Sequence, residues 1–225
     1  MTLTDWHAWH ETYDDPESWQ AQRLATVQGH IRDVLDAAPP GGISVLALVA
    51  GQGRDLLPVL ATHPRRDDVC AILVELDPRN TAAAEDAVRA AGLSGVEVIT
   101  GDAGLIDHYR AGAPADLVLI CGLFPHITDA DIEHVVKHST SLTKRGGVVI
   151  WTRHRREPDM VPRISGWFRE QGFEEVWVSE PQTQRAVGVH RYERDPRPVV
   201  FGTRLFTFVG VQKLRPWEFP ETQSA

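Results

Sequence analysis

The sequence has few cysteines and no hydrophobic run long enough to cross a lipid bilayer. Its two cysteines, Cys70 and Cys121, lie in or beside apolar runs that predict strands, so we expect buried, reduced thiols and no disulfide framework. The first residues lack the basic start, apolar stretch and small-residue cleavage site of a secretory signal. These features predict a cytoplasmic protein without a membrane partner.

Basic residues are also in short supply, with 23 Lys and Arg against 31 Asp and Glu, a formal net charge of −8. A general nucleic-acid binder needs a broad basic face for phosphates, so this balance argues against one, although a local basic patch is compatible with it. A chain of 225 residues with 42% hydrophobic content can bury a full core in one domain. We expect an N-terminal helical lid over residues 1–40, a main domain over residues 41–215 and a tail over residues 216–225.

A strand, glycine turn and helix over residues 43–57 form the central feature of the sequence. The apolar run from Ile43 to Val49 is typical of a strand buried on both faces in a parallel sheet. Gly51 and Gly53 then interrupt the run. Glycines let a ligand approach the backbone closely, and the N–H groups that open a helix attract anionic or hydroxyl-rich groups. This stretch therefore predicts a nucleotide-type cofactor site.

Strands and helices alternate along the rest of the chain, which predicts an α/β fold with a parallel sheet. A first helix is expected to begin with Asp15 as N-cap and Pro16 at its first position, and Gly92 is expected to end a later one. Residues 180–202 are predicted to form a loop. Further strands are expected at residues 70–76, 96–99, 115–121, 148–152, 173–178 and 204–209, and further helices at residues 56–61, 80–91, 129–142 and 159–171.

In parallel α/β sheets, ligands bind outside the carboxyl ends of the strands. That rule brings together residues 51–55, 75–77, 102–104, 121–126 and 153–156. Glu75 ends the second strand about 20 residues after the glycine turn, where an acid could accept both ribose hydroxyls of an adenine nucleoside. Alone, Glu75 would be interpreted as a surface acid. Asp102 also follows a strand and could accept from the adenine amino group.

Five motifs occur in the order and spacing of class I S-adenosylmethionine-dependent methyltransferases: VLALVAGQGRDL, VELDP, VITGDAG, ADLVLICGLFPHI and LTKRGGVVIWT. The resemblance spans roughly residues 43–210. It implies a Rossmann-like seven-stranded sheet, mostly parallel with an antiparallel last strand and helices on both faces, and S-adenosylmethionine as cofactor. The early WHAWH and YDDP and the later WTRHRR also resemble a group of actinobacterial methyltransferase-like proteins, which implies no single substrate.

The resemblance also implies which residues contact each part of the cofactor. The amino-acid part would lie at Ala50, Gly51 and Gly53, the ribose at Glu75, the adenine at Leu76, Asp102 and Ala103, and the methionyl end at Cys121 and Gly122. The chain departs from the family at two positions, with Ala47 where an acid is usual and Val49 where the first glycine is usual. The cofactor's ammonium group would then depend on backbone carbonyls, Asp55 or the N-terminal lid.

His126 is the leading candidate for a general base because it follows the fourth strand and titrates near neutral pH; a packing role is an equal alternative. Tyr13 could hold cofactor or substrate, or merely pack the lid. Arg153 could bind a carboxylate or phosphate, whereas Arg155 and Arg156 are better interpreted as a solvated loop paired with neighbours such as Glu157 and Asp159. An aromatic box for a planar acceptor could come from Trp6, Trp9, Trp19 and Trp151.

We therefore expect a methyltransferase that acts on a small molecule, such as an aromatic or heterocyclic secondary metabolite, at oxygen, nitrogen or an electron-rich carbon like an indole carbon. No metal is predicted. The alternatives are a non-catalytic module with this fold and, less favoured because Leu56 replaces a third glycine, a nicotinamide-dependent dehydrogenase. An RNA or protein acceptor is disfavoured by the charge, and the oligomeric state, monomer or homodimer, is left open.

Overall fold

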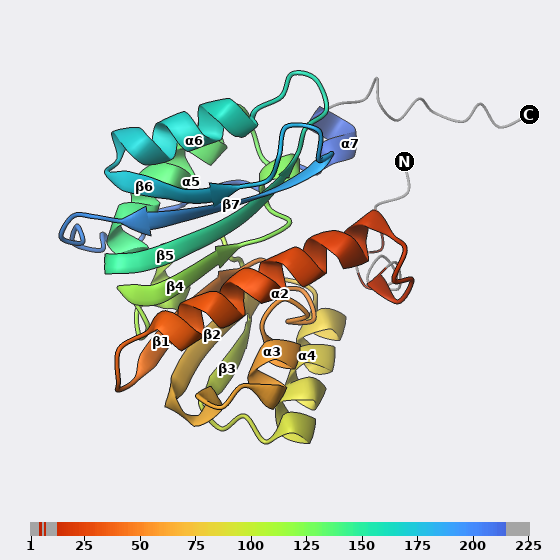
Figure 1. Ribbon diagram of the computed structural model, residues 1–225, viewed down its shortest axis with the longest axis vertical. Helices are drawn as coiled ribbons and strands as arrows, with labels where there is room; N and C mark the ends of the chain where they lie inside the picture. The colour runs from red at the N-terminus through yellow and green to blue at the C-terminus, as the bar shows by residue number, and fades with distance from the viewer. Residues whose placement is uncertain (1–4, 6, 8–12, 215–225) are drawn as a thin grey trace, which may run out of the picture.

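The computed structural model describes residues 5, 7 and 13–214 of the chain. A seven-stranded sheet in the order β3-β2-β1-β4-β5-β7-β6 forms its centre (Figure 1). Strand β7 runs antiparallel to both of its neighbours, and the other strand pairs are parallel. The predicted Rossmann-like sheet is thus confirmed. The strands are β1 (Ile43–Leu48), β2 (Val69–Glu75), β3 (Val96–Thr100), β4 (Ala115–Ile120), β5 (Thr143–His154), β6 (Phe173–Val178) and β7 (Arg185–Tyr192).

Helices cover both faces of the sheet (Figure 1). One hydrophobic cluster contains residues of α2, α3 and α4, and a second contains residues of α5 and α6. Within residues 13–214, no helix is both long and apolar enough to span a membrane. The helices are α2 (Trp19–Ala37), α3 (Leu57–Thr62), α4 (Pro78–Ala91), α5 (Asp129–Leu142), α6 (Val161–Glu170) and the short α7 (Val211–Leu214).

Strand β1 lies between the two clusters, which explains its nearly continuous apolar run. Val45 and Ala47 pack in the cluster that includes α2, whereas Leu46 and Leu48 pack in the cluster that includes α5. Successive side chains of a strand point to opposite faces, so a strand covered on both sides needs apolar residues at every position. This burial fixes the turn after β1 at one edge of the sheet.

The first described helix begins later than the sequence predicts. Ser18 is its N-cap, and the Ala21 N–H donates to Ser18 Oγ at 3.1 Å. Asp15 instead accepts from the Glu17 N–H at 3.0 Å in the preceding turn, because an aspartate can cap a tight turn as readily as a helix. The predicted end of α4 is confirmed, since Gly92 adopts the left-handed conformation with φ 63°.

The last strand was predicted in the wrong segment. It is β7, inside the expected loop, whereas residues 204–209 form only an isolated bridge between Leu105 and Arg204. The glycine in β7 weakened its strand pattern, but Gly188 stands opposite Trp151 of β5, and a methyl group built at Gly188 overlaps the indole. Gly188 is therefore a packing requirement of this strand.

The prediction for the cysteines is correct for one of the two. Both are free thiols, but only Cys121 is buried, and Cys70 is exposed near the start of β2. Val69 before it is 1% exposed and packs in the cluster that includes α2, so Cys70 points to the other face by alternation. Membership of an apolar run thus does not ensure burial of every residue in it.

We predict that Gly188→Ala destabilises the protein by about 2 kcal/mol, because the added methyl forces Trp151 to move in a packed core. Gly166→Ala is the matched control. It lies within α6 with nothing within 4 Å of the added atom, so it should stabilise the protein by roughly 0.5–1 kcal/mol. Urea unfolding of both variants measures the difference. Equal stability of Gly188→Ala and the wild type would contradict this packing account.

Candidate active site

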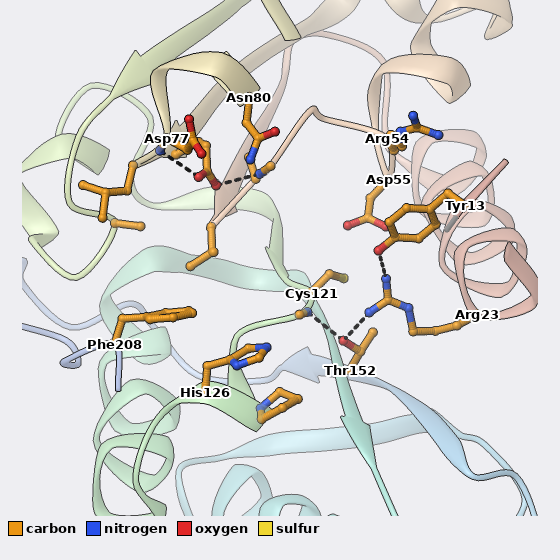
Figure 2. A pocket seen from close by; sticks show the side chains of 18 of the residues that line it. Tyr13, Arg23, Arg54, Asp55, Asp77, Asn80, Cys121, His126, Thr152 and Phe208 are labelled. Atoms are coloured by element: carbon orange, nitrogen blue, oxygen red, sulfur yellow. Dashed lines mark hydrogen bonds between the residues drawn. The ribbon is translucent and has the colours of Figure 1, made fainter. Parts of the chain in front are cut away.

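A cavity of about 980 Å³ opens at the carboxyl edge of the sheet (Figure 2). Its lining comes from Tyr13, the first turns of α2 and α4, the turn after β1, the ends of β2 and β5, the segments after β3 and β4, the start of β7 and the C-terminal segment around Phe206 and Phe208. Most of these junctions are those that the strand-end rule brought together from the sequence. The cavity is therefore the candidate active site.

The turn after β1 is held by backbone hydrogen bonds. The Ala50 N–H donates to the Val74 carbonyl at 3.0 Å, and the Gly53 N–H donates to the Ala50 carbonyl at 2.9 Å. Ala50 and Gly51 line the cavity, but Gly53 does not. A Cβ at Gly53 would lie 2.6 Å from Leu57 Cδ1, so this glycine lets the turn pack closely on α3. The expected cofactor contact at Gly53 is corrected to a packing role.

Glu75 at the end of β2 joins this turn to the start of α4. Its side chain accepts from the Gly51 N–H through Oε2 and from the Asp77 N–H through Oε1, both at 2.9 Å. Glu75 is only 6% exposed, and it lines the cavity. A carboxylate has about four acceptor positions, so each oxygen can accept one more hydrogen bond. The next residue, Leu76, is 67% exposed at the cavity and offers an apolar surface.

Asp102 and Ala103 line the cavity after β3. The Asp102 carboxylate accepts from the Gly104 N–H at 2.9 Å and pairs with Arg204 at 2.8 Å. Ala103 is buried, and its carbonyl accepts from the Tyr109 hydroxyl at 2.9 Å. The structure thus places both predicted adenine-side residues at the cavity, and it orients the carboxylate through Arg204.

Arg23 is a cavity residue for which the sequence reasoning assigned no role. It is 8% exposed, donates to the Tyr13 hydroxyl, and donates to Thr152 Oγ1 at 3.3 Å (Figure 2). Thr152 Oγ1 also accepts from the Gly122 N–H at 2.8 Å. A signal was present in the sequence, because Arg23 extends the buried stripe of α2 at a spacing of four residues, with Val27, Ile31 and Leu35.

Burial governs the ionisation of the groups around Arg23. It raises the pKa of the Asp55 carboxyl, and the nearby Arg23 opposes that rise. It raises the pKa of Tyr13 to about 12, so the phenol is neutral at pH 7. Burial and the charge of Asp55 also raise the pKa of the Cys121 thiol. These groups and Gly122 line the cavity, and Tyr13, Arg23 and Asp55 lie close together on one side of it (Figure 2).

His126 lies in a short 3-10 turn after β4 and lines the cavity. Its ring stacks on Phe208 with centroids 5.1 Å apart, and its carbonyl accepts from the Val209 and Gly210 N–H groups. Burial, with a smaller effect of Arg153, lowers the pKa of His126 to about 4. The imidazole is therefore neutral at pH 7, and the same burial makes it a weaker base than a histidine in water.

The residues predicted for the acceptor have different locations. Trp19 and Arg153 line the cavity, whereas Trp6 and Trp9 lie outside the described residues. Trp151 is fully buried in the core, where its Nε1–H donates to His190 Nδ1 at 3.1 Å. The expected substrate contact at Trp151 is therefore wrong, because alternation along β5 directs this side chain toward α6, away from the face that carries Thr152.

The arginines after β5 also differ from one another. Arg155 pairs with Asp159 at 2.9 Å, as expected, and donates to the Ser179 carbonyl at 2.7 Å. Its side chain is only 10% exposed, so it is not part of a solvated loop. Arg156, for which a solvated loop was expected, lines the cavity together with His154 and Arg185. The sequence could not reveal this convergence because Arg185 belongs to the strand that was predicted as a loop.

Residues 45–147 match a family model described as a methyltransferase domain. The comparison with curated proteins found no match. Among solved structures, an O-methyltransferase family protein from Burkholderia thailandensis is 19% identical with a TM-score of 0.57, over 81% of this chain and 62% of that one. The CurJ carbon methyltransferase is 16% identical with a TM-score of 0.61, over 76% of this chain and 54% of that one.

A third structure, the cyclase SpnF, is 14% identical with a TM-score of 0.55, over 73% of this chain and 80% of that one. At identities this low, these similarities show a shared fold and nothing about activity. The chain spans 62% and 54% of the lengths of the first two proteins.

We predict that stability falls as the pH falls from 6.5 toward 4. His126 and His190, with pKa values lowered by burial to about 4 and about 3, stay neutral in the folded protein, whereas histidines of the unfolded chain take up protons below about pH 6.5. Each should contribute a loss of about 2 kcal/mol between pH 6.5 and 4.5. Urea unfolding over this range measures it. His126→Gln should show a shallower slope than the wild type; an identical slope would contradict the lowered pKa of His126.

Proposed function

We propose that this protein is a class I S-adenosylmethionine-dependent methyltransferase and that it transfers a methyl group to a small aromatic or heterocyclic acceptor; its fold and its matched domain support this. The observation that carries the proposal is one cavity that combines the Glu75 carboxylate at the end of β2 with additional space beside His126 and Arg153. Its volume of about 980 Å³ is near the upper end of the range for small-ligand pockets, roughly 300–1,000 Å³. A nucleoside cofactor and a small acceptor fit this size together.

The donors and acceptors at the cavity suit S-adenosylmethionine. Glu75 has acceptor capacity for ribose hydroxyls, and Leu76 offers an apolar face for adenine. At the amino-acid end, the Nε of Arg23 is buried without a hydrogen-bond partner among the described residues, and Asp55 provides an opposite charge beside it. A zwitterionic amino-acid group matches such a pair of charges.

S-adenosylmethionine supplies an electrophilic methyl group on a sulfonium. In-line attack on such a carbon depends mainly on holding the nucleophile at the right distance and excluding water. Trp19 and Phe208 both line the cavity and provide apolar surface for a planar acceptor. The neutral His126 ring can accept a hydrogen bond from the O–H or N–H group of such an acceptor. With its pKa lowered to about 4 it is a weak base, so it takes up the proton only as methylation makes that group more acidic. If the acceptor atom is an aromatic carbon, the His126 imidazole would remove the proton that this carbon loses after methylation.

A second candidate function is a binding module that does not transfer methyl groups. It is favoured by Val49, which holds a positive φ of 53° where the family usually has glycine, and by Ala47 in place of an acid. The cyclase SpnF has a similar fold, so methyl transfer does not follow from the fold alone. Cofactor binding without transfer to any acceptor distinguishes this module from the enzyme.

We predict that calorimetry detects binding of S-adenosylmethionine and S-adenosylhomocysteine, and that Glu75→Gln weakens it by roughly tenfold or more, because a charge-assisted hydrogen bond to ribose becomes a neutral one. The control is Glu97→Gln, which removes an exposed carboxylate of β3 outside this cavity. Circular dichroism establishes that each variant is folded. Folded wild-type protein that binds neither nucleoside would exclude the proposed activity.

We predict that His126→Gln lowers kcat by roughly 10²-fold or more when the acceptor must lose a proton, with cofactor affinity nearly unchanged. The acceptor is first identified by mass spectrometry of extracts incubated with protein and methyl-labelled cofactor. His134→Gln on α5 serves as the control, since His134 does not line the cavity. Unchanged turnover in His126→Gln would leave His126 with a packing role against Phe208.

A further inference from the structure

We propose that the acceptor carries an anionic group, a carboxylate or a phosphate, which binds at one end of the cavity between Arg153, Arg156 and Arg185. This proposal rests on the proposed function and specifies the class of its acceptor. We call these three arginines the basic end of the cavity. All three line the cavity together with His154.

The topology of the sheet explains why these arginines meet. Arg153 belongs to the last residues of β5, and Arg156 follows the strand by two residues. Because β7 is antiparallel to β5, its first residue lies beside the last residue of β5, and His154 pairs with Arg185. By alternation, Arg185 shares the face of His154 and Thr152, whereas Arg153 is on the opposite face. The arginines therefore reach the cavity at the carboxyl end of β5 from both faces of the sheet.

Two of the arginines are held in place by contacts that suit anion binding. Arg153 is 4% exposed and donates through one guanidinium nitrogen to the Phe124 carbonyl. The Arg185 guanidinium lies over the Trp19 ring, 3.7 Å from its centroid. A guanidinium that stacks through its face keeps its N–H groups directed outward in its own plane, where they can bind carboxylate or phosphate oxygens in pairs.

Charge is divided along the cavity. The described acidic residues of the lining lie at or just after the ends of β1, β2 and β3, on the other side of β4 from β5 and β7. Each has a positive or N–H partner there: Asp55 with Arg23, Glu75 with the Gly51 and Asp77 amides, Asp77 with Arg79, and Asp102 with Arg204. Arg23, Arg54 and Arg79 also line that end, so its acidic charge is largely compensated. Among the described residues, the lining at the basic end contains arginines and no acid, which suits an anion.

The overall charge makes this local arrangement significant. A protein with a formal charge of −8 repels anions at long range, so an anionic acceptor needs a concentrated positive field at its binding site.

A purely structural use of arginine is also found in this segment. Arg155 pairs with Asp159 and the Ser179 carbonyl outside the cavity, whereas its neighbour Arg156 is exposed at the cavity.

The test uses full-length protein saturated with S-adenosylhomocysteine and a panel of matched anionic and neutral compounds. The panel pairs indole-3-acetate with indole-3-acetamide, naphthalene-1-acetate with its amide, and phenyl phosphate with its dimethyl ester. Calorimetry gives the dissociation constant of each compound. We expect at least one anion to bind about tenfold tighter than its neutral partner, as for one charge-assisted contact.

Arg156→Gln and Arg185→Gln should each reduce this preference to about threefold or less, because each removes one of the cations that hold the anion. Arg185→Lys retains the charge without the planar fork and should keep part of the preference. The control is Arg145→Gln, which removes an exposed charge that faces Asp195 outside the cavity and should keep the full preference. Arg156 is itself exposed, so its replacement leaves the core intact.

The proposal is overturned if no anion in the panel binds better than its neutral partner. It is also overturned if Arg156→Gln and Arg185→Gln both keep the full preference. Binding of S-adenosylhomocysteine is measured first, so the two levels of the argument fail separately. Failure to bind the nucleoside rejects the proposed function, whereas nucleoside binding without anion preference rejects only the anionic acceptor.

Discussion

The site depends on the buried carboxylate of Glu75. One oxygen binds the Gly51 amide in the turn after β1, and the other binds the Asp77 amide where α4 begins. A buried carboxylate is stable only when its charge is compensated by hydrogen bonds, and these two amides provide that compensation. The same bonds fix the turn relative to β2. Glu75 therefore determines both the shape of the nucleoside end of the cavity and the negative charge there.

Arg23 has a similar role on the opposite wall. It reaches from α2 to Thr152 of β5 and to Tyr13, and it lies beside Asp55. Through Thr152 the network also includes the Gly122 amide. One buried cation thus connects the segment before α2, strand β5 and the segment after β4. Its removal would leave several polar groups unsatisfied at once, which is costly in a dry interior.

The sequence predicted the parts of the fold that have strong local signals. The apolar run of β1, the glycine that ends α4 and the acids after β2 and β3 were identified because burial on both faces, a left-handed cap and strand-end chemistry each restrict the residue type. The strand β7 was missed because its Gly188 is explained only by Trp151, a partner in another strand. Trp151 was predicted at the acceptor site for a similar reason, because the face of the sheet to which a β5 side chain points depends on how β5 pairs with its neighbours. Arg23 and Arg185 also line the cavity only because distant segments of the chain come together in the fold, so local sequence patterns did not identify them.

Val49 has a consequence for ligand binding. A β-branched residue with φ 53° carries a backbone strain of order 1–3 kcal/mol, so its own preference does not produce the bend. The neighbouring bonds, from the Ala50 amide to the Val74 carbonyl and from the Gly51 amide to Glu75, impose it. The loop is accordingly rigid before any molecule arrives. An incoming nucleoside then loses little affinity to ordering of the backbone. The strain energy of the bend is instead offset by the free energy of folding of the whole sheet.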